Sequence, residues 1–355
     1  MNVFESYQLG NITLKNRVVM APMTRCRAIN NIPNALMAKY YRQRAGAGLI
    51  ITEGASPSPN GLGYPRIPGA FNDEQIAGWK EIADAVHQEG GKIFVQLMHC
   101  GRITGKVNLP EGAFTVGPSA VQAAGEIFSD TGMVAHDLPK EMTFEDIEIA
   151  KNEFVNASDR LVNEAGVDGI ELHAANGYLL DQFLNPKSNQ RTDFYGGNYM
   201  NRSRFVIEVT EKIVKKIGAE KVGIRFSPFG EFNDMEAYHN EVESMFTYLA
   251  EVLSELKIAY IHIVDQRVAF SAPDFAVDIQ KIIKEAFNGT VITGGDINNL
   301  EKATAVLNKG YDLVYVGRPY ISNPNFVEQI RLNKALVTPN MDLFYSSEPE
   351  GYTTY

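Results

Sequence analysis

The sequence predicts an α/β protein that folds as a single (β/α)8 TIM barrel, and two observations favour this fold class. Short runs that are apolar at nearly every position recur along the chain, as is typical of parallel strands covered on both faces. A longer amphipathic segment follows each run, so that strand and helix alternate. Because such barrels reach this length as one domain, residues 1–355 are assigned to a single unit.

Eight strands and eight helices are predicted from these patterns. The strands are residues 17–23, 48–52, 93–98, 169–173, 222–227, 260–264, 290–293 and 313–316. The helices are residues 33–44, 73–89, 144–165, 201–217, 241–256, 273–286, 300–308 and 324–333. A doubly wound open sheet is the rival architecture, but it normally carries a G-x-G-x-x-G turn after its first strand, and the residues from Met20 to Thr24 contain no glycine.

Three further segments complete the predicted barrel. Residues 4–14 are expected to form a short hairpin that turns at Gly10 and Asn11 and covers one end of the barrel. Residues 101–142 and 178–199 follow the third and fourth strands and are too long to be plain connections. Long loops after barrel strands belong to the end at which active sites are built, so we expect the site there.

The composition excludes several classes of protein. The net charge of −10 argues against a nucleic-acid or anionic-membrane partner. The two cysteines, Cys26 and Cys100, are far apart and outside any C-x-x-C pattern, so no disulfide framework and no metal site is predicted. No apolar run approaches the roughly 20 residues that span a bilayer, and the N-terminus lacks the features of a signal peptide. We expect a cytoplasmic protein.

The stretch from Gly169 to Phe183 holds the strongest chemical signal. Its strand delivers His173 and Asn176 to one end of the barrel, and Gly177 then permits a turn that presents Tyr178. Two neutral donors followed by a phenol suit a site that stabilises an anion and then donates a proton. Each residue alone is better explained as satisfying loop backbone or filling the core, but together they favour a catalytic role.

At this point the sequence resembles the Old Yellow Enzyme family, and in particular its bacterial branch of alkene and N-ethylmaleimide reductases. The resemblance covers almost the whole chain, and the run from residue 171 to residue 197 is long and distinctive. The motifs that carry it are APMTRCRA (21–28), YYRQRAGAGLIITEG (40–54), VQLMHCGR (95–102), ELHAANGYLLDQFLNPKSNQRTDFYGG (171–197), VGRPYISNP (316–324) and EGYTTY (350–355).

The resemblance implies catalytic roles for three residues. His173 and Asn176 are expected to donate hydrogen bonds to the carbonyl of an α,β-unsaturated substrate, which stabilises the charge that develops when hydride reaches the β-carbon. Tyr178 is then expected to protonate the α-carbon from the opposite face. A phenol with an ordinary pKa of about 10 is protonated at neutral pH and can act as an acid.

The resemblance also implies contacts to the ring of a non-covalently bound FMN. Thr24 is expected at the C4 carbonyl, Gln96 at the pyrimidine edge and Arg225 near N1 and the C2 carbonyl, where a guanidinium stabilises the reduced flavin. The alternatives are a local cap for Thr24, a satisfied core amide for Gln96 and a carboxylate partner for Arg225, although no acidic residue adjoins Arg225 in the sequence. The remaining ring contacts are assigned to Pro22, Met23 and Gly54.

Phosphate binding is expected after the seventh and eighth strands, where barrels of this kind bind phosphate. Gly295 and Gly317 let backbone N–H groups approach the phosphate, and Arg318 adds a cation. Asp296 is an awkward neighbour because its carboxylate would repel phosphate. We therefore expect its amide to bind while the side chain turns away.

The substrate pocket is less well determined by the motifs. Tyr64, Met98, Phe232 and Tyr345 stand where the family lines its pocket. Met98 replaces a tryptophan that many relatives carry, which favours a more open and pliable pocket, although a gap-filling core methionine is nearly as good an explanation. Cys26 is best explained as a small buried residue, with tuning of the flavin as a lesser alternative.

By this resemblance the protein is an FMN-dependent ene-reductase. NADPH or NADH would reduce the flavin, and the substrates would be activated alkenes such as enones, maleimides and nitroalkenes, or nitrate esters. The chain would act as a monomer or a homodimer. Two alternatives stay open: a flavin-binding sensor without turnover, and a barrel aldolase or isomerase acting on a phosphorylated substrate. The second would need a lysine or a carboxylate base at a strand end, and no lysine stands there.

Overall fold

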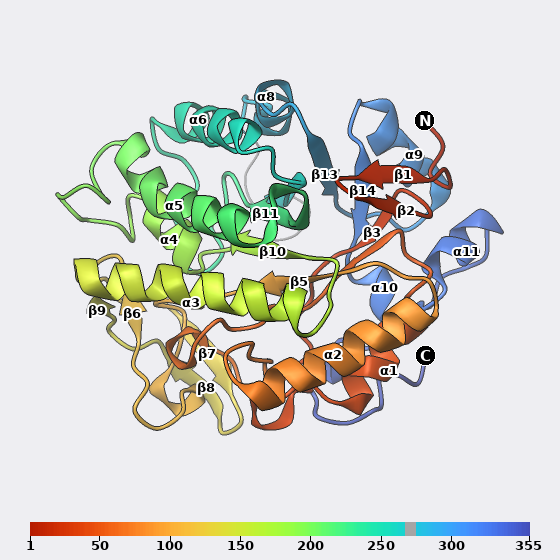
Figure 1. Ribbon diagram of the computed structural model, residues 1–355, viewed down its shortest axis with the longest axis horizontal. Coiled ribbons are helices and arrows are strands. Elements are labelled where there is room, and N and C mark those ends of the chain that lie inside the picture. The colour runs from red at the N-terminus through yellow and green to blue at the C-terminus, as the bar shows by residue number, and fades with distance from the viewer. Residues whose placement is uncertain (267–274) are drawn as a thin grey trace.

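The computed structural model describes residues 1–266 and 275–355 and has a closed barrel of eight parallel strands at its centre (Figure 1). Each strand pairs with the next along the chain, and β14 closes the barrel against β3. The predicted fold class is thereby confirmed. The barrel strands are β3 (Val18–Met20), β4 (Leu49–Ile51), β5 (Ile93–Leu97), β10 (Gly169–Ala174), β11 (Val222–Phe226), β12 (Tyr260–Ile263), β13 (Thr290–Gly294) and β14 (Leu313–Val316).

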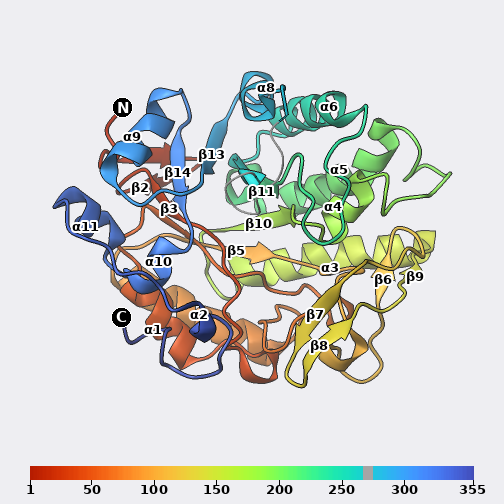
Figure 2. The same ribbon diagram turned by 180° about the vertical axis from the view of Figure 1, so that it is seen from behind.

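Helices surround the barrel on its outside (Figures 1 and 2). The described helices are α1 (Ala35–Gln43), α2 (Asp73–Gln88), α3 (Phe144–Asn163), α4 (Leu179–Leu184), α5 (Tyr199–Ile217), α6 (Val242–Glu255), α8 (Ile279–Ala286), α9 (Leu300–Asn308), α10 (Pro319–Ser322) and α11 (Phe326–Arg331). Short 3-10 turns lie at Ile29–Asn31, Pro59–Gly61, Lys106–Asn108, Ala219–Lys221 and Met341–Leu343.

Capping residues set the helix ends and explain where the predicted bounds differ. Helices α2 and α3 begin after capping boxes at Asn72 and Thr143. Helix α8 begins after Asp278, whose side chain accepts from the Lys281 amide. The predicted helix 273–286 therefore starts too early, and its first two residues lie outside the described part of the chain.

The predicted N-terminal hairpin is present. Strands β1 (Tyr7–Leu9) and β2 (Ile12–Leu14) pair antiparallel around Gly10, which has φ +52°. Leu9 and Leu14 are fully buried and pack in one cluster with apolar side chains of the barrel strands. The hairpin thus covers one end of the barrel and leaves the other end for the long loops.

Both long connections contain regular structure. Residues 101–142 form the hairpin of β7 (Glu126–Ser129) and β8 (Gly132–Ala135) and the short pair of β6 (Val116–Gly117) with β9 (Lys140–Glu141). In Figures 1 and 2 the β7–β8 hairpin lies on the opposite side of the molecule from β1 and β2. Residues 178–199 are not a loop throughout, because α4 begins directly after Tyr178.

Inside the barrel an apolar layer lies below a polar one. The apolar layer joins the hairpin to the strands and includes Val19, Leu49, Ile51, Phe94, Tyr260 and Leu313. The polar layer is next along the strands and contains Gln96, Glu171, Arg225 and His262, which are all buried. A polar layer in this position faces the ends of the strands where the site is expected.

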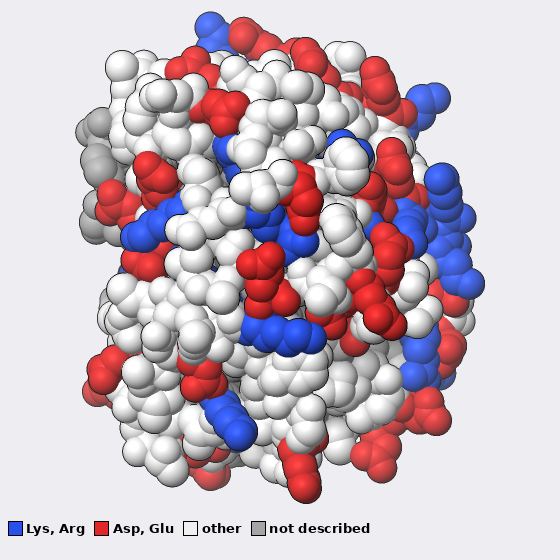
Figure 3. Space-filling view, turned by 90° about the vertical axis from the view of Figure 1, so that its left-hand side faces the viewer, with Lys and Arg blue, Asp and Glu red and all other residues white. Residues whose placement is uncertain are grey.

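Ion pairs join the helices of the outer ring. Lys151 of α3 is buried, and its Nζ lies 2.5 Å from Glu148 Oε1, donates to the Tyr195 hydroxyl at 2.8 Å and pairs with Glu208 of α5. Figure 3 shows acidic and basic side chains interspersed on the face that it presents. Within the described residues, no helix is long and apolar enough to cross a membrane.

Replacing Gly223 of β11 by alanine is expected to destabilise the barrel. A Cβ atom at this position would lie 2.1 Å from Cζ of Tyr260, whose ring is fully buried. We expect Gly223→Ala to lower the free energy of unfolding by about 1–3 kcal/mol, measured as a lower midpoint of urea denaturation.

Gly46→Ala is the matched control. A Cβ atom there meets nothing within 4 Å, so the expected change stays within about 0.5 kcal/mol. Equal midpoints for both variants would contradict the steric argument.

Candidate active site

Two adjoining cavities lie at the ends of the barrel strands, and every residue of the predicted site lines one of them. The first has a volume of about 310 Å³ and the second about 380 Å³. They share Pro22, Met23, Asn176, Arg225 and Arg318. The first also holds Thr24, Gly54, Tyr64, Gln96, Met98, His173, Tyr178, Phe232 and Tyr345, and the second holds Gly295, Asp296 and Gly317.

The three predicted catalytic residues come together at the end of β10. His173 belongs to the strand, and the chain then turns through Asn176 (φ +58°) and Gly177 (φ +77°). The turn places Tyr178 at the start of α4, with its ring edge-to-face against His173 and 4.8 Å between ring centroids. The Tyr178 hydroxyl donates to that of Tyr64 at 3.1 Å.

Burial fixes the protonation of this group. Desolvation and the neighbouring Arg225 hold the pKa of His173 well below its usual value, so the imidazole is neutral at neutral pH. Desolvation and the nearby Tyr64 raise the pKa of Tyr178 well above its usual value, so it stays a phenol. The site therefore presents a neutral ring donor beside a protonated phenol.

The Asn176 side chain is oriented by Gln266, which the sequence analysis missed. Gln266 Nε2 donates to Asn176 Oδ1 at 3.0 Å, which leaves the Asn176 amide nitrogen as a free donor. Asn233 Nδ2 donates to the Asn176 backbone carbonyl at 2.7 Å. Both partners follow other barrel strands, β12 for Gln266 and β11 for Asn233, so no local sequence pattern could have indicated them.

A second missed pair, Asp181 and Ser227, holds the turn itself. The Gly177 amide donates to Asp181 Oδ2 at 2.8 Å, and Ser227 Oγ donates to the same oxygen at 3.3 Å. Ser227 Oγ in turn accepts from the backbone N–H of Asn176 at 2.7 Å. The buried carboxyl group of Asp181 thus holds the left-handed turn before Tyr178 by hydrogen bonds. Burial raises the pKa of Asp181 to about 7.

The predicted flavin contacts surround the floor of the first cavity. Thr24 makes no side-chain hydrogen bond among the described residues, so it is not a local cap there. Gln96 Nε2 donates to Glu171 Oε1 at 2.7 Å, so one half of its amide is satisfied. Met98 is buried, and a Cβ atom at Gly54 would lie 2.7 Å from its sulfur, which explains the glycine.

Arg225 has a nearby acid that its sequence neighbours did not show. Glu171 on the adjacent strand β10 acts to raise the pKa of Arg225, although burial outweighs it and the net pKa is lowered. No salt bridge within 4 Å joins Arg225 to a carboxylate among the described residues, and its buried Nε has no hydrogen-bond partner there. No acid adjoins Arg225 in the sequence, but the barrel brings Glu171 of the neighbouring strand near it.

The second cavity has the features expected at a phosphate site. A Cβ atom at Gly317 would meet nothing within 4 Å, so its backbone borders open space, and Gly295 has φ +120°. The side chain of Arg318 is exposed at the same place. Asp296 Oδ2 accepts from Lys302 Nζ at 2.5 Å, so its carboxylate is turned toward α9 and neutralised there.

The outer wall of the first cavity comes from the C-terminal segment, residues 341–355. Tyr345 lines the cavity, and its segment is held by the fully buried arginines Arg25, Arg27 and Arg44. Their guanidinium groups donate to backbone carbonyls of Leu343, Phe344, Glu348, Glu350, Gly351 and Tyr352. The Tyr352 ring stacks on Tyr40 of α1 at 3.9 Å. We call this contact of Arg25, Arg27 and Arg44 with residues 341–355 the arginine clasp, and the sequence did not predict it.

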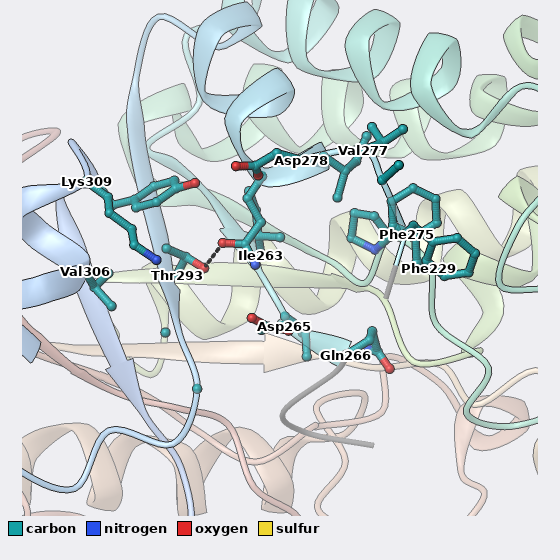
Figure 4. Close-up of a pocket in the computed structure, with 18 residues that line it drawn as sticks. Phe229, Ile263, Asp265, Gln266, Phe275, Val277, Asp278, Thr293, Val306 and Lys309 are labelled. Carbon is teal, nitrogen blue, oxygen red and sulfur yellow. Dashed lines mark hydrogen bonds between the residues drawn. The ribbon is translucent and has the colours of Figure 1, made fainter. Parts of the chain in front are cut away.

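A third cavity of about 420 Å³ lies between the ends of β12 and β13 and helix α8 (Figure 4). Thr293 Oγ1 donates to Gln280 Oε1 at 3.0 Å within it. Of the predicted site residues it contains Gly295 alone. It therefore lies beside the predicted site and not within it.

Comparison with known proteins places the chain in a family. A family model described as the NADH:flavin oxidoreductase / NADH oxidase family matches residues 2–336. This chain belongs to that family. It is 36% identical over 372 residues to 12-oxophytodienoate reductase 7 of Oryza sativa subsp. japonica, covering 99% of this chain and 94% of the rice protein. The predicted membership of the Old Yellow Enzyme family is confirmed, and the protein is an oxidoreductase of that family.

Solved structures of the Old Yellow Enzyme family superpose on the whole chain. Morphinone reductase does so with a TM-score of 0.95 and 37% identity, covering 100% of this chain and 96% of that protein. The Old Yellow Enzyme homologue from Zymomonas mobilis has a TM-score of 0.94 and 35% identity, covering 100% and 99%. Another morphinone reductase structure is a complex with tetrahydroNAD.

FMN, which the family description implies, fits the residues of the two cavities. His173 Nδ1 and Arg225 Nε are buried without a partner in the described structure, as expected of groups around a polar ligand. Thr24, Gln96 and Arg225 line the floor of one cavity, and Gly317 and Arg318 line the other. Hydrogen-bonding groups at one end and a glycine-bordered cation at the other suit a heterocycle that carries a phosphate.

Replacing Asp181 by asparagine is expected to flatten the pH dependence of stability. The folded-state pKa of about 7 lies above the ordinary value of about 3.9, so the fold favours the protonated form. The stability contributed by that proton is complete below about pH 4 and is lost as the pH rises through 7. Between pH 5 and pH 8, Asp181→Asn should therefore lose less unfolding free energy than the native chain.

The measurement is urea denaturation at several pH values. Asp84→Asn, on the exposed surface of α2, is the control and should keep the native pH profile. The same slope in Asp181→Asn and in the native protein would contradict the buried-acid assignment.

Proposed function

We propose that this protein is an FMN-dependent NAD(P)H oxidoreductase that reduces activated C=C bonds. The observation that carries the proposal is the neutral His173 and the free side-chain amide nitrogen of Asn176 beside the protonated Tyr178, all lining a cavity that fits a flavin. The proposed substrates are enones, maleimides and nitroalkenes, whose polar groups these donors can bind, with nitrate esters as a further class. When bound, FMN supplies the hydride, which it takes from NADPH or NADH.

His173 and Asn176 bind and polarise the substrate. Hydride arrival at the β-carbon of an enone places negative charge on the carbonyl oxygen, and fixed donors stabilise that charge most when water is excluded. His173 is 4% exposed, and Gln266 holds the Asn176 amide in place. Little reorganisation is therefore needed at the moment when the charge forms.

Tyr178 completes the reaction by giving its hydroxyl proton to the α-carbon. Its raised pKa keeps the proton in place until the substrate has gained electron density. Tyr64, 3.1 Å away, can turn its own hydroxyl hydrogen toward the phenolate that remains. The buried anion is thereby hydrogen-bonded until solvent returns a proton.

The pocket walls support a substrate of moderate size. Met98 is buried beside Gly54, whereas Phe232 and Tyr345 are 38% and 48% exposed at the mouth. A methionine adapts its shape more readily than a fixed aromatic ring, so the pocket should accept several substrate shapes. The relatives named for 12-oxophytodienoate and morphinone support an unsaturated ketone as the substrate class.

The alternatives differ in what the residues would have to do. A barrel aldolase would need a lysine in the site, and the described residues that line the two cavities include none. A sensor without turnover would not need Tyr178. Purified protein should be yellow with flavin absorbance and should turn over NADPH or NADH with 2-cyclohexenone; a colourless protein would overturn the proposal.

Tyr178→Phe is expected to slow alkene reduction and spare flavin reduction. The phenyl ring keeps the packing against His173 but has no proton to give, so the oxidative half-reaction should fall by roughly 10²-fold or more. Reduction of the flavin by NADPH or NADH should keep its native rate. Anaerobic stopped-flow measurement of each half-reaction separates the two.

Tyr320→Phe is the matched control for that variant. Tyr320 is fully buried, and its hydroxyl has no partner among the described residues. Both half-reactions should keep their native rates in this control. Equal losses of the two half-reactions in Tyr178→Phe would contradict the proton-donor role.

Arg318→Ala is expected to weaken FMN binding without changing the ring chemistry. A charge-assisted contact to phosphate contributes about 1.5–3 kcal/mol, so the dissociation constant should rise on the order of tenfold or more. Fluorescence titration of apoprotein with FMN measures the effect, and Arg42→Ala on exposed α1 is the control. If Arg318→Ala weakened riboflavin as much as FMN, the contact to phosphate would be wrong.

A further inference from the structure

Glu171 is a buried acid at the centre of the barrel to which neither the motifs nor the proposed mechanism assigns a role. It lies on β10, two residues before His173, and is 0% exposed. Gln96 Nε2 lies 2.7 Å from Oε1, and His262 Nδ1 lies 2.9 Å from Oε2. These partners come from β5 and β12, so the carboxylate links strands on both sides of β10.

The strand register brings Glu171 close to Arg225 without a direct ion pair. His173 and His262 are both register partners of Arg225, and Gly223 is the β11 partner of Glu171. Gly223 has no side chain, and Arg225 lies two residues further along β11. The carboxylate and the guanidinium are therefore near each other but not directly side by side. Glu171 nevertheless acts to raise the pKa of Arg225, which shows that the two charges interact favourably.

The carboxylate also determines how Gln96 faces the cavity. An ionised carboxylate only accepts hydrogen bonds, so the atom of Gln96 that points to it must be the amide nitrogen. The Gln96 oxygen is then left for the cavity that this residue lines. A flavin pyrimidine edge, which carries an N–H group between two carbonyls, would meet an acceptor at that point.

We infer that Glu171 is a positioning residue and a counter-charge for the flavin site: it orients Gln96 as an acceptor and offsets part of the positive charge of Arg225. This inference rests on the proposed use of FMN. Reduction adds negative charge to the flavin, which Arg225 stabilises and Glu171 opposes, and both effects are strong in the barrel interior. Glu171 therefore lowers the reduction potential of the bound flavin.

The test is the midpoint potential of FMN bound to Glu171→Gln. Glutamine keeps the shape of the side chain and removes its charge. We expect a more positive potential, with the ratio of reduced to oxidised flavin raised tenfold or more at a fixed solution potential, which is about 30 mV for a two-electron couple. Equilibration of the holoenzyme with a reference dye measures the potential.

Two variants separate charge from structure. Asp168→Asn also removes a carboxylate, but this one lies just before β10 and binds His87 and Lys92 near the opposite end of the strand, so the potential should be unchanged. Glu171→Asp keeps the charge and shortens the reach, so its potential should stay close to the native one. A shift in Asp168→Asn equal to that in Glu171→Gln would overturn the inference.

His262→Phe covers the case in which Glu171→Gln does not fold. Loss of the His262 donor removes one of the hydrogen bonds that hold the Glu171 carboxylate in place, so we expect a potential that differs from the native one. A native potential in folded Glu171→Gln, or in His262→Phe if the first variant fails to fold, would overturn the role of Glu171. Failure of the native protein to bind FMN would instead overturn the proposed function.

Discussion

The parallel pairing of β10 with β5 on one side and β11 on the other is the constraint on which the site depends. The register with β5 places Glu171 beside Gln96, and the register with β11 places His173 beside Arg225. Side chains alternate along each strand, so a shift of one residue would turn all four away from the barrel interior. The spacing of these four side chains is thus fixed by the backbone hydrogen bonds of three strands rather than by contacts among the side chains themselves.

This constraint also explains the division of the barrel interior into layers. The apolar layer beneath, closed by Leu9 and Leu14 of the hairpin, excludes water from one end. The polar layer above is satisfied in part by its own hydrogen bonds and in part by groups that point into the cavities. Buried polar atoms without partners are rare in proteins, so His173 Nδ1 and Arg225 Nε, which belong to residues that line the first cavity, are the groups that a ligand there would satisfy.

The sequence predicts the parts of the molecule that depend on local order. Barrel strands are recognisable because both faces are buried, and site residues such as His173 and Arg318 lie at or just after the ends of strands and match family motifs. The sequence did not show that Asp181 supports Gly177, because Asp181 belongs to the short helix α4. It could not show that Gln266 orients Asn176, because these two residues follow different barrel strands. Helix α4 was missed because its six residues are too few to show a periodic pattern. The roles of the site residues stay predictions until the variants are measured.

The arginine clasp attaches the C-terminal segment to the barrel and makes that segment part of the pocket wall. Residues 341–355 form no strand of the barrel, yet they provide Tyr345 to the cavity wall and satisfy three buried arginines near the start of the chain. Arg25 directly follows Thr24 and Arg27 lies two residues further on, so the C-terminal segment is bound beside a residue of the first cavity. The eight barrel strands close without this segment, whereas the wall of the pocket is complete only when the segment is docked. Detachment of the segment would leave cationic groups without acceptors, and that cost keeps the pocket wall in place.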